Sequence, residues 1–129
     1  MLERRLSIRV ECEIPSEFRN LDPKYPSHKI YETLVKNISR GGVCLHVNEF
    51  IPIQCHLYFY LRLPNHETIE VRIAPTWIKE RPNLGKYEMG ARFVEMSPSQ
   101  EDAIQDFQYE RLAKKTASSE SLFHQGLGA

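Results

Sequence analysis

Apolar and polar residues alternate along most of the first 95 residues, and this alternation predicts β-strands. At residues 10–14 apolar side chains at every second position are separated by glutamates, as expected for a strand with one buried face. Pro15 would confine that strand to an edge or a bulge. The same period of two predicts five more strands, at residues 30–38, 43–47, 57–63, 69–77 and 87–93, with a bulge at Pro75 in the fifth.

Six short strands, most with one apolar face, predict a mainly β fold. The arrangement that buries six such faces is a closed or nearly closed six-stranded antiparallel β-barrel, here over residues 10–95. Two prolines and several polar residues predict a loop at residues 19–29. The glycines at residues 41–42 predict a hairpin turn between the second and third strands.

A helix is predicted after the barrel. Ser97 is a favourable N-cap, Pro98 suits the first helical position, and Gln100 completes a capping box. Apolar residues at positions 103, 104 and 107 form a short stripe, so we expect a helix over residues 97–114 that packs on the barrel. Residues 116–129 are rich in Ser and Gly, and we expect a disordered tail there.

Charge and composition limit the classes of partner. The 17 basic side chains equal the 17 acidic ones, whereas a domain that binds long nucleic acid is expected to be basic. No apolar stretch resembles a signal peptide or approaches the length of a membrane helix, so we expect a cytoplasmic protein with no membrane insertion. The three cysteines are an odd number without C-x-x-C spacing, and the five histidines are scattered, so neither a disulfide framework nor a metal site is expected.

Two short motifs carry the candidate chemistry. Arg5 and Arg9 form Arg-x-x-x-Arg immediately before the first strand, in a basic arm over residues 1–9 that we expect to be flexible. Arginine suits phosphate oxygens and guanine edges alike. Asn37 and Ser39 share one face of the second strand if it persists to Ser39, and the glycines that follow allow close backbone approach. Taken alone, each motif is also compatible with a solvated basic start and an ordinary turn.

Together and in this order, the motifs resemble the PilZ domain, a bacterial receptor module for cyclic dimeric GMP (c-di-GMP). The resemblance extends from about residue 4 to residue 115 and includes residues 90–93, which look like the closing strand of that family. It implies a PilZ-like split barrel over residues 1–115. It also implies a c-di-GMP site, with Arg40 and Arg92 as additional candidates, formed by Arg4, Arg5, Arg9, Asn37, Ser39, Gly41 and Gly42.

The resemblance implies a receptor rather than an enzyme. No nucleophile elbow or P-loop is present, and no cofactor is expected. Signalling would proceed by ligand-induced ordering of the arm and contact with an unidentified downstream protein. The arginine at position 4, directly before the first motif, resembles the arrangement in family members that hold an intercalated pair of ligands. Trp77 is expected to be a barrel residue rather than a stacking platform.

Two other functions stay open. One is a PilZ-like adaptor in pilus or flagellar assembly that binds no nucleotide, although such adaptors typically lack the arginine motif. The other is a small RNA-binding barrel, for which Tyr58, Tyr60 and Arg62 form a faint version of the basic, aromatic strand face that RNA requires.

Overall fold

The computed structural model describes residues 8–24, 29–64, 66–82 and 86–128. Six strands and one helix make up the described backbone. In chain order they are β1 (Val10–Asn20), β2 (Tyr31–Ile38), β3 (Gly42–Val47), β4 (Leu57–Leu61), β5 (Ile69–Arg81), β6 (Lys86–Val94) and α2 (Pro98–Gly128). The predicted basic arm lies mostly outside the described residues, because only its last two positions are included.

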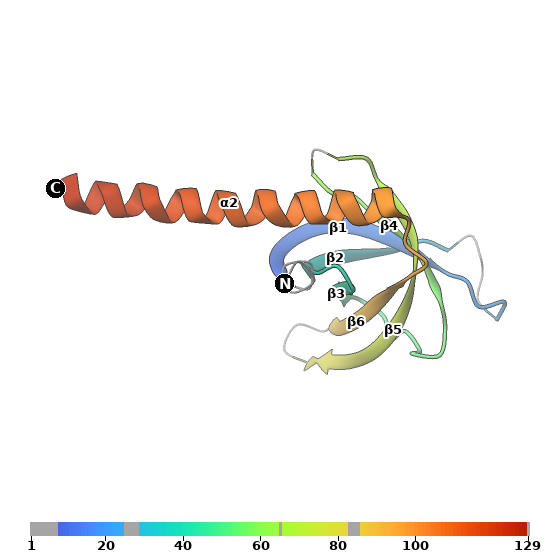
Figure 1. Cartoon of the computed structure of the whole chain (residues 1–129). Coiled ribbons are helices and arrows are strands. Elements are labelled where there is room, and N and C mark those ends of the chain that lie inside the picture. The colour runs from blue at the N-terminus through green and yellow to red at the C-terminus, as the bar shows by residue number, and fades with distance from the viewer. Residues whose placement is uncertain (1–7, 25–28, 65, 83–85, 129) are drawn as a thin grey trace.

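The six strands close into one antiparallel barrel in the order β1-β2-β3-β6-β5-β4, with β4 pairing back to β1. The predicted mainly β, six-stranded antiparallel barrel followed by a helix is therefore confirmed. Figure 1 shows the strands curving around a common interior, with α2 lying beside β1. Closure leaves no free sheet edge among these strands, so their outer faces are the surface available for binding.

The barrel interior is filled by the alternating apolar side chains that the sequence pattern indicated. Phe18, Leu45, Phe59 and Met89 come from four different strands and are fully buried. A fully buried side chain of this size stabilises the fold by about 1.5–3 kcal/mol relative to an exposed one. The inward alternation leaves the intervening side chains of each strand on the outer face of the barrel.

The first strand is longer than predicted. It continues through Pro15 to Asn20, so residues 19–20 are strand and the predicted loop at 19–29 starts later. The proline is tolerated because β1 pairs with β4 only from Glu17 onward, which leaves Pro15 with a single neighbouring strand, β2. A register shift between Glu11 and Ile14 supplies the expected irregularity close to the proline.

The helix α2 begins as predicted and ends later. Ser97 and Gln100 form the reciprocal capping box: the Gln100 N–H donates to Ser97 Oγ at 3.2 Å, and the Ser97 N–H donates to Gln100 Oε1 at 3.0 Å. Ile104 and Phe107 are buried in the barrel core. The helix then continues to Gly128 and projects well beyond the barrel (Figure 1).

The predicted end at residue 114 and the predicted disordered tail at 116–129 are therefore wrong for the backbone up to Gly128. The prediction gave weight to the Ser and Gly content of this stretch. No proline follows Pro98, however, and the two glycines of the helix lie in its last turn. The intervening Ala, Glu, Lys and Gln residues favour helix, and Ser is only mildly unfavourable.

Candidate functional site

The hairpin between β2 and β3 is built by the second motif. The Ser39 N–H donates to the Gly42 carbonyl at 2.9 Å, and the Phe93 N–H of β6 donates to the Gly41 carbonyl at 2.9 Å. Ile38 points into the core and is fully buried, as the sequence pattern predicted. The Ser39 hydroxyl is also buried and donates to the Gly42 carbonyl at 3.5 Å. The turn is therefore fixed on both sides, by its own bonds and by β6.

The two motifs meet at Arg9 and Asn37. The register of β1 and β2 places Glu11 opposite Asn37, which brings Arg9 to the same end of the outer face. Arg9 Nη1 donates to Asn37 Oδ1 at 2.8 Å across 28 residues of sequence. Arg9 is exposed and Asn37 is half-buried, so both side chains are accessible from solvent. Arg4 and Arg5 lie outside the described residues.

A surface hollow of about 540 Å³ lies beside this contact. Its lining comes from β2, β3, β5 and β6 and from the residue that precedes β1. The lining includes every predicted motif residue that the structure describes, together with one of the two additional arginine candidates: Arg9, Asn37, Ser39, Gly41, Gly42 and Arg92. The other candidate, Arg40, points elsewhere, and its Nη2 lies 3.9 Å from Glu101 Oε2 on α2.

Gly42 has a structural role in the barrel. A Cβ at this position would collide with the backbone carbonyl of Ala91, because β3 and β6 approach each other closely there. The missing side chain therefore makes room for a neighbouring strand, which is one of the close approaches, by backbone or by ligand, that the sequence allowed for. Gly41 has open space in the direction of a Cβ, so it places no such demand on the fold.

The exposure of Trp77 on the outer face was not expected from the sequence. The period of two along β5 placed it on the same face as Ile73, which is fully buried, but the register shifts between Pro75 and Trp77. The shift turns the indole to the outer face, where the side chain is 43% exposed and lines the hollow. The predicted bulge at Pro75 was the signal that could have placed Trp77 outside, because one extra residue reverses the alternation.

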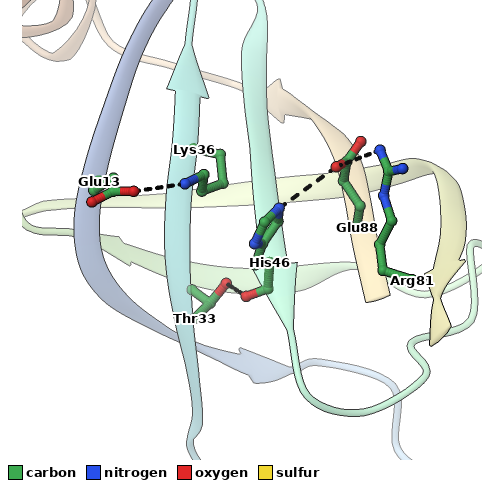
Figure 2. Close-up of polar contacts among 6 residues, drawn as sticks. All are labelled: Glu13, Thr33, Lys36, His46, Arg81 and Glu88. Atoms are coloured by element: carbon green, nitrogen blue, oxygen red, sulfur yellow. Dashed lines mark hydrogen bonds and ion pairs between the residues drawn. The ribbon is translucent and has the colours of Figure 1, made fainter. Parts of the chain in front are cut away.

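Charged side chains cross the outer face next to the hollow (Figure 2). Arg81 Nη2 lies 2.9 Å from Glu88 Oε2, and His46 Nε2 lies 3.5 Å from the same oxygen. Lys36 Nζ donates to Glu13 Oε1 at 2.8 Å, and this hydrogen bond, with the lysine charge, holds the pKa of the Glu13 carboxyl below its ordinary value. Glu88 also lines the hollow, so an acidic group lies there together with Arg9 and Arg92.

Cys44 contributes a thiol to the hollow. In the strand registers it lies opposite Asn37 on one side and Gly90 on the other. Burial raises the pKa of the Cys44 thiol, so the group stays protonated near neutral pH and acts as a weak hydrogen-bond donor. Among the described residues no group of three or more His, Cys, Asp or Glu side chains is placed to hold a metal ion.

The aromatic face considered for RNA is partly covered. The Tyr58 and Tyr60 rings pack edge to face, with centroids 5.2 Å apart. The Arg19 guanidinium lies over both rings, 5.6 Å and 5.8 Å from their centroids. Arg62 is paired with Glu17 at 2.6 Å. Internal contacts therefore occupy the groups that an RNA base or phosphate would need.

Sequence comparison matches a family model described as PilZ domain to residues 3–110. No curated protein matches the chain with statistical support. Within the part of the chain that the structure describes, no helix combines the length and apolar character needed to cross a membrane.

Solved structures share the fold. The Bacillus subtilis inhibitor of motility (MotI/DgrA) superposes with a TM-score of 0.69 at 21% identity, and the match covers 84% of this chain and 51% of that one. The PilZ domain of Escherichia coli YcgR with c-di-GMP gives 0.65 at 14% identity, covering 91% and 98%. The PilZ domain of CeSA from a cellulose-synthesizing bacterium gives 0.59 at 15% identity, covering 81% and 97%. The chain therefore spans about half the length of MotI and nearly all of the two isolated domains.

Proposed function

The chain belongs to the PilZ domain family, and on that premise we propose that it is a cytoplasmic receptor for c-di-GMP rather than an enzyme. The observation that carries the proposal is the Arg9–Asn37 hydrogen bond, which joins the two motifs at the edge of one accessible hollow. Each motif alone has an ordinary structural explanation. A fold that brings them together, with a tryptophan beside them, offers the chemistry that a cyclic dinucleotide needs.

The groups in the hollow suit the parts of the ligand. Arg9 and Arg92 offer charged, forked donors for phosphate oxygens or for guanine O6 and N7. Trp77 offers an exposed ring on which a base can stack. Asn37 and Ser39 supply short hydrogen-bonding side chains at the floor. This combination matches a small anionic ligand with flat bases better than it matches a long nucleic acid.

In the proposal, Arg4 and Arg5 join the ligand from the basic arm, and two intercalated c-di-GMP molecules occupy the completed site. Two ligands bring four phosphates, so additional guanidinium groups offset their charge and stack on exposed bases. Ordering of the arm by the ligand is then the event that a downstream protein detects.

The described contacts of α2 support this route to the output. Gln108 Nε2 donates to the Ile8 carbonyl at 2.6 Å, and Arg111 Nε donates to the Glu11 carbonyl at 3.0 Å. The arm therefore leaves the barrel at a segment held by α2, while the Glu101 carboxylate of α2 lies near Arg40 in the second motif. A ligand that binds both motifs therefore acts on two of the segments that α2 contacts.

The alternative is a nucleotide-independent adaptor. The observation in its favour is the projecting helix, on which Tyr109 and Leu112 are exposed and available to a protein partner. The adaptor function, however, leaves the joined motifs and the exposed Trp77 without a role. In either case we propose that the chain acts on a downstream protein. The name of MotI, an inhibitor of motility, makes a component of a motility apparatus one candidate.

Isothermal titration calorimetry with c-di-GMP tests the proposed function directly. The expected result is saturable binding that GTP and GMP do not reproduce at the same concentration. Loss of that binding in Arg9→Ala, with an unchanged thermal melt, would assign it to the hollow. Absence of c-di-GMP binding to the unaltered chain overturns the receptor and favours the adaptor.

A further inference from the structure

Among the described residues that line the hollow, Glu88 is the one acidic side chain, and the other charged side chains there are Arg9 and Arg92. Its neighbours there include Arg9, Arg92 and Trp77, which donate hydrogen bonds and do not accept them. The Asn37 carbonyl oxygen already accepts from Arg9. The Glu88 carboxylate weakens the attraction of the hollow for phosphate groups. Its presence there therefore indicates a role other than phosphate binding.

The two carboxylate oxygens of Glu88 differ in their contacts. Arg81 approaches Oε2 at 2.9 Å, and His46 approaches the same oxygen at 3.5 Å. Within the described part of the chain, Oε1 has no hydrogen-bond or ion-pair partner. Figure 2 shows the carboxylate between His46 and Arg81, held from both sides. The Glu88 side chain is 20% exposed, so the carboxylate is partly accessible to a molecule in the hollow.

We propose that Glu88 selects guanine, its Oε1 accepting hydrogen bonds from the N1–H and the exocyclic amino group of a bound base. This inference rests on the proposed function. Guanine presents two adjacent donors at that edge, which a single carboxylate can accept. Adenine presents an unprotonated ring nitrogen there, so the carboxylate oxygen would face another acceptor and stay unpaired.

Arg81 and His46 are positioning residues in this arrangement. By holding Oε2, Arg81 fixes the direction of Oε1 and offsets the carboxylate charge near the ligand phosphates. Gly90 lies two positions along β6 from Glu88, and Trp77 lies opposite Gly90 in the register, which places the acceptor near the proposed stacking platform. A base lying against Trp77 over Gly90 would then direct one edge toward Glu88.

The test compares the affinities of cyclic dimeric GMP, cyclic dimeric inosine monophosphate and cyclic dimeric AMP by calorimetry, at one pH and salt concentration. The inosine compound keeps N1–H and lacks the amino group. For the unaltered chain we expect affinity to fall in the order guanine, inosine, adenine. In Glu88→Gln the guanine compound should bind about tenfold or more weakly, since a charge-assisted hydrogen bond is lost. The adenine compound should bind as well as before or better, because an amide can donate to adenine.

Glu13→Gln is the matched control. It removes one negative charge from the same outer face, but from a residue paired with Lys36 outside the hollow. A general charge effect would strengthen all three ligands in both variants. If Glu88 selects guanine, the ratio of guanine to adenine affinity changes in Glu88→Gln and stays unchanged in Glu13→Gln.

Arg81→Met tests the positioning step. We expect a smaller loss of the guanine preference than in Glu88→Gln, and no additional loss when the two substitutions are combined, because Arg81 acts through Glu88. An unaltered affinity ratio in Glu88→Gln, with c-di-GMP still bound by the parent chain, overturns the inference and leaves the receptor function intact. A parent chain that binds none of the three compounds overturns both.

Discussion

The Trp77 indole lies directly against the α-carbon of Gly90, so closely that a Cβ on Gly90 would collide with the Nε1 and Cε2 atoms of the ring. The two residues are register partners on β5 and β6. Gly90 is therefore the reason that an indole can settle on the outer face at this point. One side of the ring contacts backbone, while the side chain keeps 43% of its surface exposed.

Trp77→Ala should weaken c-di-GMP binding with little effect on stability. Stacking of a base on an aromatic side chain contributes about 1–3 kcal/mol, which corresponds to roughly fivefold to more than a hundredfold in affinity. Trp77→Phe should retain most of the affinity. Because Trp77 is the sole tryptophan of the chain, ligand binding should also change its fluorescence, giving a direct titration.

Tyr109→Ala is the control for Trp77, since Tyr109 has a comparable exposed fraction of 40% on α2 and does not line the hollow. Equal losses of affinity in the two variants would point to a general effect of removing a surface aromatic ring. Unchanged affinity in Trp77→Ala would show that no base stacks there.

Gly42→Ala should destabilise the barrel. The new methyl group would overlap the backbone carbonyl of Ala91, which cannot rotate away as a flexible side chain can. Overpacking of this kind typically costs about 1–3 kcal/mol. Gly41→Ala is the matched control, with open space for the added group and an expected change within about 0.5 kcal/mol. Urea denaturation of both variants measures the difference, and equal stabilities would contradict the close approach of β3 and β6.

Arg9→Ala should reduce c-di-GMP affinity by about tenfold to a hundredfold, the equivalent of a charge-assisted contact of about 1.5–3 kcal/mol. The fold should survive because Arg9 is exposed. Arg62→Ala removes another exposed arginine, which lies on another part of the barrel and does not line the hollow, and should leave the affinity unchanged. Arg5→Ala, at a position outside the described residues, should resemble Arg9→Ala. Full affinity in Arg9→Ala would mean that the Arg9–Asn37 bond is only structural.

The sequence was informative wherever one periodicity governed a segment. Alternation predicted all six strands and the burial of Ile38, and the capping box at Ser97 placed the start of α2. These features depend on neighbours a few residues away. They could therefore be inferred without knowing how the strands pair.

Features that depend on pairing between distant segments could not be predicted in this way. The outward direction of Trp77 follows from a register shift against β6, and the need for glycine at position 42 follows from the approach of Ala91. The continuation of β1 through Pro15 depends on where β4 begins to pair. Glu88 had no motif to mark it, because its place in the site comes only from the order of strands in the closed barrel.

Cys12 should make stability fall as the solution becomes alkaline. Burial raises the pKa of its thiol from the ordinary value of 9.0 to about 11. Between these values the unfolded chain loses the Cys12 proton while the folded chain keeps it, so rising pH favours unfolding. Denaturant titrations from pH 8 to pH 10 should therefore show a steeper loss of stability in the parent chain than in Cys12→Ala.

A parallel measurement of thiol reactivity checks the same cause. With its thiolate suppressed, Cys12 should react with iodoacetamide far more slowly in the folded chain than in urea at the same pH. Identical pH dependence in the parent chain and Cys12→Ala, or fast alkylation of folded Cys12, would show that the thiol is not shielded as the fold indicates.

Arg4 precedes the first motif and lies outside the described residues. If the site holds an intercalated pair of ligands, calorimetry should give two c-di-GMP molecules per chain. Arg4→Leu should lower that number toward one, because the second molecule loses a guanidinium that offsets its phosphates and stacks on its base. Arg5 and Arg9 should still bind the remaining ligand, so affinity for the first molecule should change little. A stoichiometry of one in the unaltered chain at saturating ligand would exclude the pair, and Arg4 would then be a surface charge or a minor phosphate contact.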